Sequence, residues 1–247
     1  MIQRSVILLL MFVFVGCGED EPEKVKPKEV VDEAPEEGII WKKDGARMAL
    51  IPAGSMVELD AFYMDIHEVT VQRFKKFVRE TGYEYDHWDD VAEYSPTSKH
   101  PMIFVNLHEA TAYCEWSGKR LPTETEWEFA ARGGLVDKTF TWGDDEGVAR
   151  HYANCTGMRG RDKWKYCAPV GRLKPNGYGL YDMSGNVWEW CRGWYGGDRS
   201  SRFLRGGSWS DDSDYLPVAN RNDGISPTDI TSGYGFRCVS GFPAVQP

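Results

Sequence analysis

Apolar residues recur at helical spacing just after residue 70 of the chain. Val71, Phe74 and Phe77 fall on one face of a helical projection, Thr70 precedes them, and Gly82 follows them. A threonine before the first apolar position and a glycine after the last one are typical of helix ends. The spacing therefore predicts a helix from about 70 to 82.

Two more helices are expected between residues 106 and 133. Asn106 is placed to cap the first of them, which should end by Gly118. Thr123 and Glu126 have the spacing of a capping box for the second, and Gly133 follows its last apolar position.

The remaining apolar patterns are short and irregular. Residues 48–59 alternate loosely around Pro52 and Gly54, as a strand, a turn and a second strand would, and 62–66 reads as another short strand. Residues 84–101 are predicted to form a long loop, and no helical period returns after residue 133. The chain is therefore expected to have an α+β fold whose second half is rich in loops.

The first residues resemble an export signal of the lipoprotein type. Arg4 is followed by an apolar run of ten residues, Val6 to Val15, which is too short to span a bilayer as a helix. The run ends in Gly16 and Cys17, which predicts a signal peptide over 1–16 and lipid attachment at Cys17. An ordinary signal peptide and a buried apolar strand are the alternatives.

The segment after Cys17 has a different composition from the rest of the chain. Residues 17–38 are dense in Glu, Lys, Pro and Val and contain no aromatic residue, so they predict a flexible, charged tether. Residues 39–247 are long enough for one large domain. The full chain carries a net charge of −9 and has no basic patch, which argues against a nucleic-acid partner.

Cysteine and histidine spacing limits the kinds of metal site that are plausible. Export implies an oxidising compartment, and five cysteines remain besides Cys17, so at least one should be a free thiol. No two of the five histidines are three or four residues apart, so a zinc or iron site built on helical His spacing is poorly supported.

Several longer motifs then occur in a fixed order. They are GKRLPTETEWEFAARGG (118–134), TWGDD, PNGYGLYDMSGNVWEW (175–190), RGGSW and GFRC. Together they resemble the formylglycine-generating enzyme family over about 45 to 240. This resemblance implies a variant of the C-type lectin fold, rich in loops.

The resemblance also implies two calcium sites, and the residue types suit that ion. The first would use Asp182, Glu189 and the carbonyls of Gly185 and Val187. The second would use the side chains of Asn154 and Asp162 with the carbonyls of Cys155 and Trp164. Without the resemblance, Asp182 and Glu189 could simply cap turns.

Disulfide bonds follow from the same resemblance. It implies that Cys114 pairs with Cys238, which would tie the second predicted helix to the end of the domain. Cys155 and Cys167 flank the second proposed ion loop and are predicted to pair as well. Cys191 would then remain a free thiol.

The chemistry of the oxidase is not expected to accompany its fold. The enzymes of this family use two copper-binding cysteines shortly after the GGS-aromatic motif, and the corresponding positions here fall near Asp211 and Tyr215. No cysteine lies between Cys191 and Cys238, so a thiolate site for copper is missing from this stretch and no copper is expected. Because fold alone does not assign function, another role is needed.

The stretch from 205 to 237 suggests that role. From Ser210 to Gly235 it contains no Lys, Glu, Gln, Met or Trp. Its composition, its position and its RGGSW and GFR borders resemble the variable region of diversity-generating retroelement proteins, which use the same lectin-like fold. The resemblance implies that variable codons derive from a template codon, typically AAC, whose adenines are replaced at random, and such replacement cannot produce those five residue types. The residues expected to be exposed, varied and ligand-binding are Asp211, Asp212, Asp214, Tyr215, Asn222, Asp223, Gly224, Asp229, Thr231, Ser232 and Tyr234.

Other residues of the same stretch are expected to hold it in place. This packed frame comprises Trp209, Val218, Ala219, Arg221, Phe236 and Arg237. A plain polar loop without a binding role is the alternative interpretation of the whole stretch. The tryptophans Trp188, Trp190, Trp194 and Trp209 could be read as a carbohydrate platform, but buried packing is the favoured interpretation.

Taken together, the patterns predict a non-catalytic lipoprotein that binds ligands through a diversified C-terminal site. We expect it on the bacterial outer membrane, at the cell surface, held by its lipid, with an unknown protein or cell-surface ligand as partner. An oxidase with altered chemistry and a structural envelope lipoprotein are the alternatives.

Overall fold

Residues 38–54, 58–156, 164–195 and 200–241 are described by a computed structural model. The predicted signal peptide, Cys17, nearly all of the tether and Asp162 lie outside the described residues. Within those ranges no helix has both the length and the apolarity that a membrane crossing would need. The described residues belong to one unit, Asp32–Pro247.

The three helices expected from the apolar spacing are confirmed. They are α1 (Val71–Thr81), α3 (Leu107–Trp116) and α4 (Glu124–Arg132). The Thr70 hydroxyl accepts from the Arg73 amide at the start of α1, and the left-handed Gly82 (φ 71°) follows its end. Both α3 and α4 begin with a complete capping box, so the partner acid of Asn106, which the sequence analysis missed, is Glu109.

A fourth helix lies where a long loop was expected. Helix α2 (Trp88–Tyr94) has no side-chain cap at His87, and Val91 is its only fully buried residue. Neither a capping signal nor an apolar stripe in the sequence therefore predicts it. It is held by aromatic packing, because the Trp88 ring meets Tyr85 at 4.8 Å and Phe74 of α1 at 6.3 Å. Tertiary contacts therefore determine this helix.

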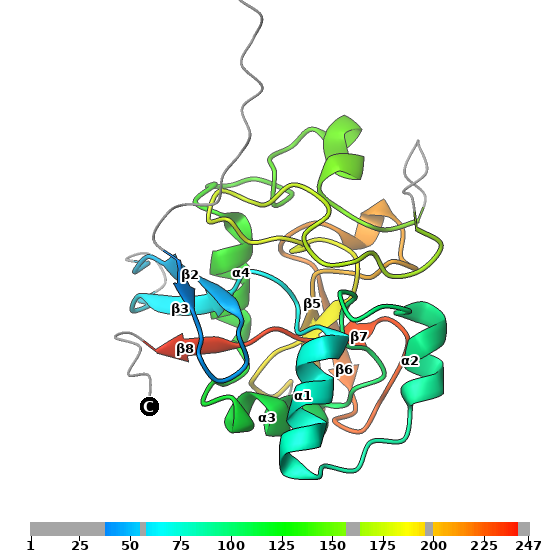
Figure 1. Ribbon diagram of the computed structural model, residues 1–247. Coiled ribbons are helices and arrows are strands. Elements are labelled where there is room, and N and C mark those ends of the chain that lie inside the picture. The colour runs from blue at the N-terminus through cyan, green and yellow to red at the C-terminus, as the bar shows by residue number, and fades with distance from the viewer. Residues whose placement is uncertain (1–37, 55–57, 157–163, 196–199, 242–247) are drawn as a thin grey trace, which may run out of the picture. The chain divides into compact units, whose positions relative to one another are not determined.

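The first sheet joins the start of the domain to its end. Its strand order is β1 (Ile39–Ile40), β2 (Arg47–Ile51), β3 (Phe62–Asp65) and β8 (Val239–Gly241), all antiparallel. Figure 1 shows the red strand β8 beside β3. The strand, turn and strand expected over 48–59 correspond to β2 and a single bridge between Gly54 and Leu59.

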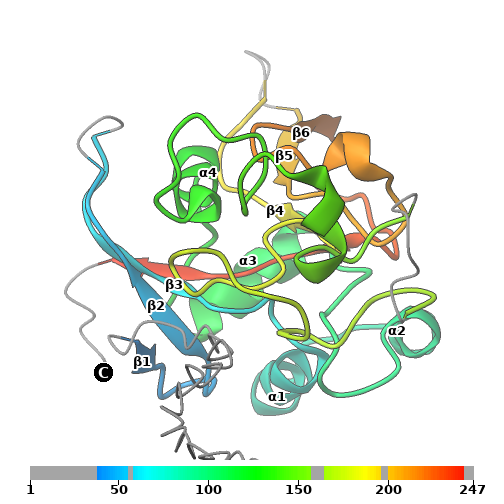
Figure 2. The same cartoon turned by 90° about the horizontal axis from the view of Figure 1, so that it is seen from above.

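The second sheet is built from the loop-rich half. Its order is β6 (Arg221–Ile225), β5 (Arg202–Arg205), β4 (Trp188–Trp190) and β7 (Tyr234–Gly235), and β4 and β7 run parallel. Two short 3₁₀ helices, Glu146–His151 and Ser213–Tyr215, complete the described elements. In Figure 2 strands β4, β5 and β6 are grouped beside α4. Strand β6 is at an edge, so only one side of it is paired.

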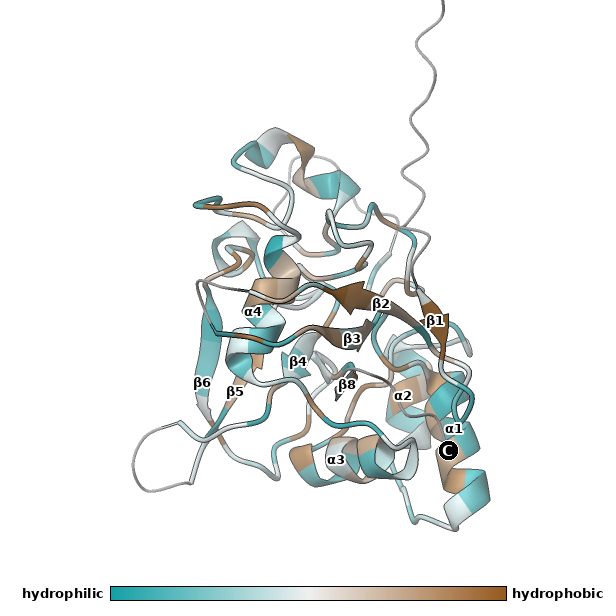
Figure 3. Cartoon of the chain, turned by 90° about the vertical axis from the view of Figure 1, so that its left-hand side faces the viewer, coloured by the Kyte–Doolittle hydropathy of each residue, from teal (hydrophilic) through white to brown (hydrophobic). Residues whose placement is uncertain are grey.

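Two large apolar clusters form the core. One joins α1 and α3 to the second sheet through Phe74, Tyr113, Trp190 and Phe236. The other packs α4 against the first sheet through Trp127, Ile51, Met64 and Val239. In Figure 3 strands β2 and β3 are coloured as hydrophobic, whereas strand β6 is coloured as hydrophilic. The two sheets thus differ in how much of each serves the core.

A buried ion cluster ties the first sheet to the end of α3. Lys119 Nζ contacts Asp44 at 2.6 Å and Asp65 at 2.8 Å, and none of the three side chains is exposed. Burial disfavours the charged amine, but the two carboxylates outweigh it, and the pKa of Lys119 is raised.

The capping box of α4 gives a direct test of the local argument. Thr123→Ala removes the acceptor for the Glu126 amide and should lower the free energy of unfolding by about 1 kcal/mol. The exposed Thr125, two residues along, is the matched control, and Thr125→Ala should change stability by less than about 0.5 kcal/mol. Urea unfolding followed by tryptophan fluorescence measures both. Equal effects of the two substitutions would contradict the capping role.

Candidate functional site

The stretch 205–237 begins with a buried arginine. Arg205 ends strand β5, is 1% exposed, and donates to the carbonyls of Val218, Ala219 and Asn220 as well as to Glu128. The Arg205 side chain therefore binds the backbone of residues 218–220, about fifteen residues further along the chain. Three of its acceptors are backbone atoms, so the contact does not depend on which side chains occupy 218–220.

The two glycines that follow make room for this return. A Cβ on Gly206 would lie 3.1 Å from the Trp127 ring, and Gly206 has φ 102°. Gly207 has φ 81°, and a Cβ there would lie 3.3 Å from the Tyr215 carbonyl. Side chains rarely adopt such φ values, so this turn requires glycine.

A second buried arginine closes the stretch. Arg237 Nε and Nη2 contact the Glu189 carboxylate at 2.7 to 2.9 Å, and its other donations go to the carbonyls of Asp65 and Tyr181. Glu189 Oε2 also accepts from the Trp127 indole at 2.7 Å. Burial works against the charge of Arg237, but Glu189 outweighs it and the pKa of the guanidinium is raised. This ion pair links β4 with the backbone of β3.

Of the frame residues expected to pack, Val218, Phe236 and Arg237 are buried, and Trp209 is half-buried with its indole donating to the Ser232 carbonyl. Ala219 and Arg221 are exposed, so neither side chain packs in the core, although both residues help to anchor the loop. Ala219 contributes its carbonyl to Arg205 rather than its side chain to the core. Arg221 lies at the edge of the sheet and pairs with Glu124 and Asp223.

Seven of the eleven predicted binding positions are exposed. They are Asp212, Asp214, Tyr215, Asp223, Gly224, Asp229 and Thr231. We call these seven positions the terminal face. They lie on the Ser213–Tyr215 turn, on strand β6 and on the loop that leads to β7. The hydrogen bonds and ion pairs of their side chains reach no further than three residues along the chain.

The other four predicted positions are half-buried, and Asp211 is the clearest correction among them. Its carboxylate accepts from the Trp188 indole at 2.7 Å and from the Ser208 amide and hydroxyl at 2.9 and 2.6 Å. Its own carbonyl accepts from the Thr156 amide. Asp211 therefore joins the loop to strand β4 and is not directed outward.

Tyr234 is also partly structural, and Asn222 and Ser232 share its neighbourhood. The Tyr234 ring meets Trp190 edge-on at 5.7 Å, and burial is the main reason why its pKa is raised. Asn222 is opposite the buried Leu204 in the sheet, and its side chain contacts Tyr234. The Ser232 carbonyl accepts from the Trp209 indole. These three residues are half-buried and are next to residues of the terminal face along the chain.

The tryptophans considered for a carbohydrate platform also differ in how far they are buried. Trp188 and Trp190 are buried, as the packing interpretation expected. Trp194 is 42% exposed, which contradicts that interpretation, because its neighbour is a guanidinium and not the core.

The predicted calcium ligands are only partly available. Two of them keep a buried oxygen without a hydrogen-bond partner, Asn154 Oδ1 and Asp182 Oδ1. Asp182 belongs to the first predicted site and Asn154 to the second, and a bridge between Asn154 and Gly185 joins the two segments, where a Cβ on the glycine would lie 2.3 Å from the Asn154 carbonyl. Glu189 does not fit, because Arg237 and Trp127 occupy both of its oxygens. The described residues hold no group of three or more acidic, histidine or cysteine side chains suited to a metal.

A buried acid near this place was missed by the sequence analysis. Glu68 is fully buried, and both of its oxygens accept from the Asn186 amide at 3.0 Å. Burial first, and then the nearby Asp182 and Glu189, raise the pKa of Glu68 well above its usual range. No local motif surrounds Glu68, and its partner is 118 residues away, so no sequence signal identifies it.

The cysteines are buried, and neither predicted disulfide is present among the described residues. The Cys114 and Cys238 sulfurs nevertheless lie 2.7 Å apart, so the structure brings this pair together. Cys155 donates to the Thr156 carbonyl, and Cys167 Sγ lies 3.9 Å from the Ser232 carbonyl. Both pairings stay predictions for the oxidised protein. Cys191 is a buried thiol whose pKa is raised by burial.

Comparison with known proteins now decides the family. Residues 29–241 match the model of the sulfatase-modifying factor enzyme 1-like domain. The chain belongs to this family. It is 33% identical to the mouse formylglycine-generating enzyme over 250 residues, with 74% of this chain and 67% of that protein covered. It is similarly close to the mouse inactive C-alpha-formylglycine-generating enzyme 2, at 32% identity and 76% of that protein.

Among solved structures, the chain resembles Treponema denticola variable protein 1. The two share 25% identity and a TM-score of 0.68, with 85% of this chain and 99% of that chain covered. The expected loop-rich α+β fold of the formylglycine-generating-enzyme type is therefore confirmed. The sulfatase-modifying factor family includes relatives named as enzymes and relatives named as inactive, so membership alone does not decide catalysis.

Asp211 and Asp214 provide a matched pair within one loop. Asp211→Ala leaves the Trp188 indole and the Ser208 amide without their acceptor and should lower the free energy of unfolding by about 1–3 kcal/mol. Asp214 is exposed, and Asp214→Ala should stay within about 0.5 kcal/mol of the parent. Guanidinium unfolding compares them. An Asp211 variant as stable as the Asp214 variant would show that Asp211 belongs to the terminal face after all.

Proposed function

We propose that the chain is a non-catalytic ligand-binding protein whose terminal face is diversified and whose lipidated Cys17 holds it at the surface of the bacterial outer membrane. The observation that carries this proposal is the division between a buried frame and an exposed face in one stretch of chain. Arg205 and Arg237 are 1% and 0% exposed, whereas Tyr215 is 47% exposed. The similarity to Treponema denticola variable protein 1 supports the same function.

The contacts of the terminal face support tolerance to substitution. Asp212 accepts from the Asp214 amide, Asp229 from the Ser226 amide, and Thr231 from the Gly233 amide. These bonds are local, so replacing these three side chains removes no hydrogen bond to a distant part of the described chain. Hydrogen bonds that span 13 to 172 residues are made instead by Arg205, Asp211 and Arg237 of this stretch.

The chemistry of the face suggests what it would bind. Four of its seven positions are aspartates, and one tyrosine supplies an aromatic surface. Arg221 is the neighbouring cation, and it is already paired with Glu124 and Asp223. A surface with unpaired carboxylates favours a cationic or polar ligand by electrostatic complementarity. Tyrosine and small polar residues are also the common side chains of antibody binding sites.

The absence of catalysis is proposed from the residues at the place of the enzyme's cysteines. Asp211 is held by three donors from Trp188 and Ser208, and Tyr215 lies exposed beside it with its ring 6.3 Å from that of Trp188. Neither residue supplies a thiolate for copper. Ligand recognition, and not copper-dependent oxidation, is therefore the function proposed for this region.

Library selection tests the division between face and frame. Random substitution at the six face positions other than Gly224, whose φ of 75° favours glycine, should leave most variants folded, because among the described residues no side chain there makes a hydrogen bond or ion pair beyond three residues along the chain. Random substitution at Arg205, Asp211 and Arg237 should leave few, since breaking a buried ion pair alone costs about 3–5 kcal/mol. Protease resistance of displayed libraries measures both fractions. Equal fractions would refute the proposed division.

Sequencing the locus in independent isolates tests diversification itself. We expect a reverse transcriptase gene and a template repeat that differs from codons 210–235 only at adenines. A locus that lacks both, with an invariant stretch in all isolates, would refute the proposal, whatever the libraries show.

Calcium is proposed as a stabiliser of the backbone beneath the face. Asn154 Oδ1 and Asp182 Oδ1 are the buried oxygens without a partner, and burial raises the pKa of Asp182 to about 6. A cation at either oxygen would satisfy that atom, and Ca²⁺ accepts such mixed oxygen ligands; Asp182 belongs to the first predicted site and Asn154 to the second. Glu189 is left out of this ligand set.

Thermal unfolding in EDTA and in excess calcium tests this site. At a hundredfold excess over Kd a bound ion adds about 2.7 kcal/mol, and each kcal/mol raises Tm by about 2–4 °C for a domain of this size. Asp182→Asn keeps an acceptor for the Gly171 amide but removes the charge, so it should abolish most of the calcium-dependent rise. Asp214→Asn is the control and should retain it. Equal Tm values with EDTA and with calcium would contradict the site.

A further inference from the structure

A pocket of about 600 Å³ lies between helix α3 and the chain that connects β4 to β5. Helix α3 contributes Leu107, Thr111 and Glu115 to its walls, and the connection contributes Arg192 and Trp194. None of the eleven predicted binding positions lines it. Its volume is in the range of sites for small molecules.

Arg202 is the most unusual residue of this pocket. Its guanidinium stacks 3.3 Å from the centre of the Trp194 ring, and Nη1 donates to the Gly193 carbonyl at 2.6 Å. Its Nε is buried and has no hydrogen-bond partner. Burial lowers the pKa of Arg202, and no carboxylate offsets that effect. A guanidinium in this state has donors available for an anion.

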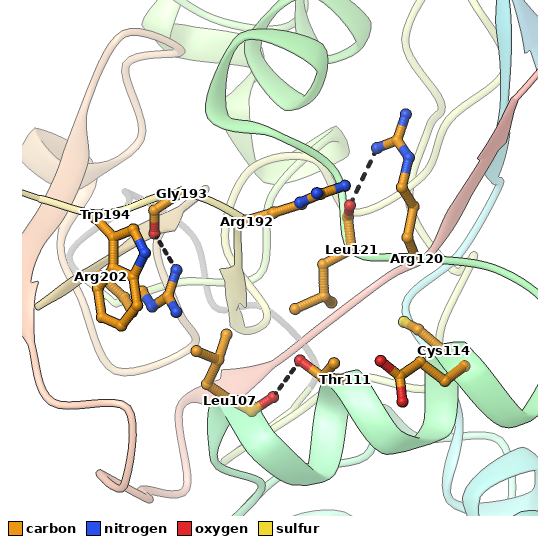
Figure 4. Close-up of a pocket in the computed structure, with 10 residues that line it drawn as sticks. Leu107, Thr111, Cys114, Arg120, Leu121, Arg192, Gly193, Trp194 and Arg202 are labelled. Atoms are coloured by element: carbon orange, nitrogen blue, oxygen red, sulfur yellow. Dashed lines mark hydrogen bonds between the residues drawn. The ribbon is translucent and has the colours of Figure 1, made fainter. Parts of the chain in front are cut away.

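Arg192 is the second arginine of the pocket that has no carboxylate partner among the described residues. It is exposed, and within the described ranges its side chain makes no hydrogen bond or ion pair; only its amide is bonded, to the Pro122 carbonyl. Arg120, by contrast, is neutralised by Glu126, whose two oxygens lie 2.6 and 2.7 Å from its guanidinium. Figure 4 shows Arg120 and Arg192 along one wall and Arg202 against Trp194 on another, with Leu107 and Leu121 between them.

The charges of the pocket differ from those of the whole molecule. Within the described residues the guanidinium groups of Arg192 and Arg202 have no carboxylate partner, and the pocket lining holds one exposed carboxylate, that of Glu115, in a chain whose net charge is −9. Arg237, which serves the fold alone, has a carboxylate and two carbonyls as partners. Arg192 lacks such partners, so a purely structural role does not account for it.

We propose that this pocket binds a small organic anion, an apolar or aromatic body that carries a carboxylate or phosphate group. The anionic group lies against Arg192 and Arg202, and the body packs on Leu107, Leu121 and the Trp194 ring. Guanidinium groups bind both kinds of oxyanion through paired N–H donors, which accounts for arginine at both positions. The pocket is separate from the terminal face and does not depend on its diversification.

Titration of the full chain with four probes tests the proposal. Benzoate and phenyl phosphate combine an anion with an aromatic body, whereas acetate and inorganic phosphate supply the anion alone. Calorimetry and quenching of tryptophan fluorescence should show benzoate or phenyl phosphate binding at least about tenfold more tightly than its small counterpart. The tighter of the two aromatic probes identifies the anionic group. No saturable binding of either aromatic probe would overturn the proposal.

Three variants connect the binding to the pocket. Arg192→Gln removes an exposed charge whose side chain makes no hydrogen bond or ion pair among the described residues, and it should weaken binding about tenfold or more. Glu115→Gln removes the opposing carboxylate and should strengthen binding. Arg150→Gln changes an exposed arginine outside the pocket by the same amount and should leave the affinity unchanged. Equal losses in the Arg192 and Arg150 variants, or no change in the Arg192 variant, would place the binding elsewhere and overturn the proposal.

Discussion

The ion pair between Arg237 and Glu189 is the contact on which the rest of this half of the molecule depends. It lies at 0% exposure on both sides, and it connects strand β4 to the carbonyl of Asp65 at the end of β3. The Trp127 indole of α4 completes the shell around Glu189. Both sheets and one helix therefore meet at a single guanidinium. Removal of one partner would leave a buried charge, which is far more costly than losing the pair together.

Around this pair, the fold separates contacts that need a particular side chain from contacts that need only backbone. Arg205 donates to three successive carbonyls, so the residues at 218–220 can change without loss of those bonds. Asp211 is the exception within the loop, because its carboxylate serves Trp188 on β4. The proposed diversification of the terminal face would leave these contacts in place.

Local rules were enough to predict three helices, whereas the outline of the face came from the composition of the stretch and its resemblance to a variable region. Thr70, Asn106 and Thr123 each cap a helix, and these signals act within four residues of the chain. Long-range contacts explain what was missed. Helix α2 is held by rings from α1, and Asp211 is turned inward by a tryptophan 23 residues away. The pocket beside α3 gathers arginines at 120, 192 and 202, which no pattern along the chain connects.

The edge position of β6 has a consequence for the evolution of the gene. This strand pairs only with β5 and carries exposed residues at 221, 223 and 224. An outer strand has no second neighbour whose side chains must match each new one, so most codon changes here yield a viable product. The Asp211 carboxylate, in contrast, accepts from Trp188 and Ser208. Under the proposed diversification, replacement of this residue lowers stability, so selection favours templates that keep aspartate at codon 211.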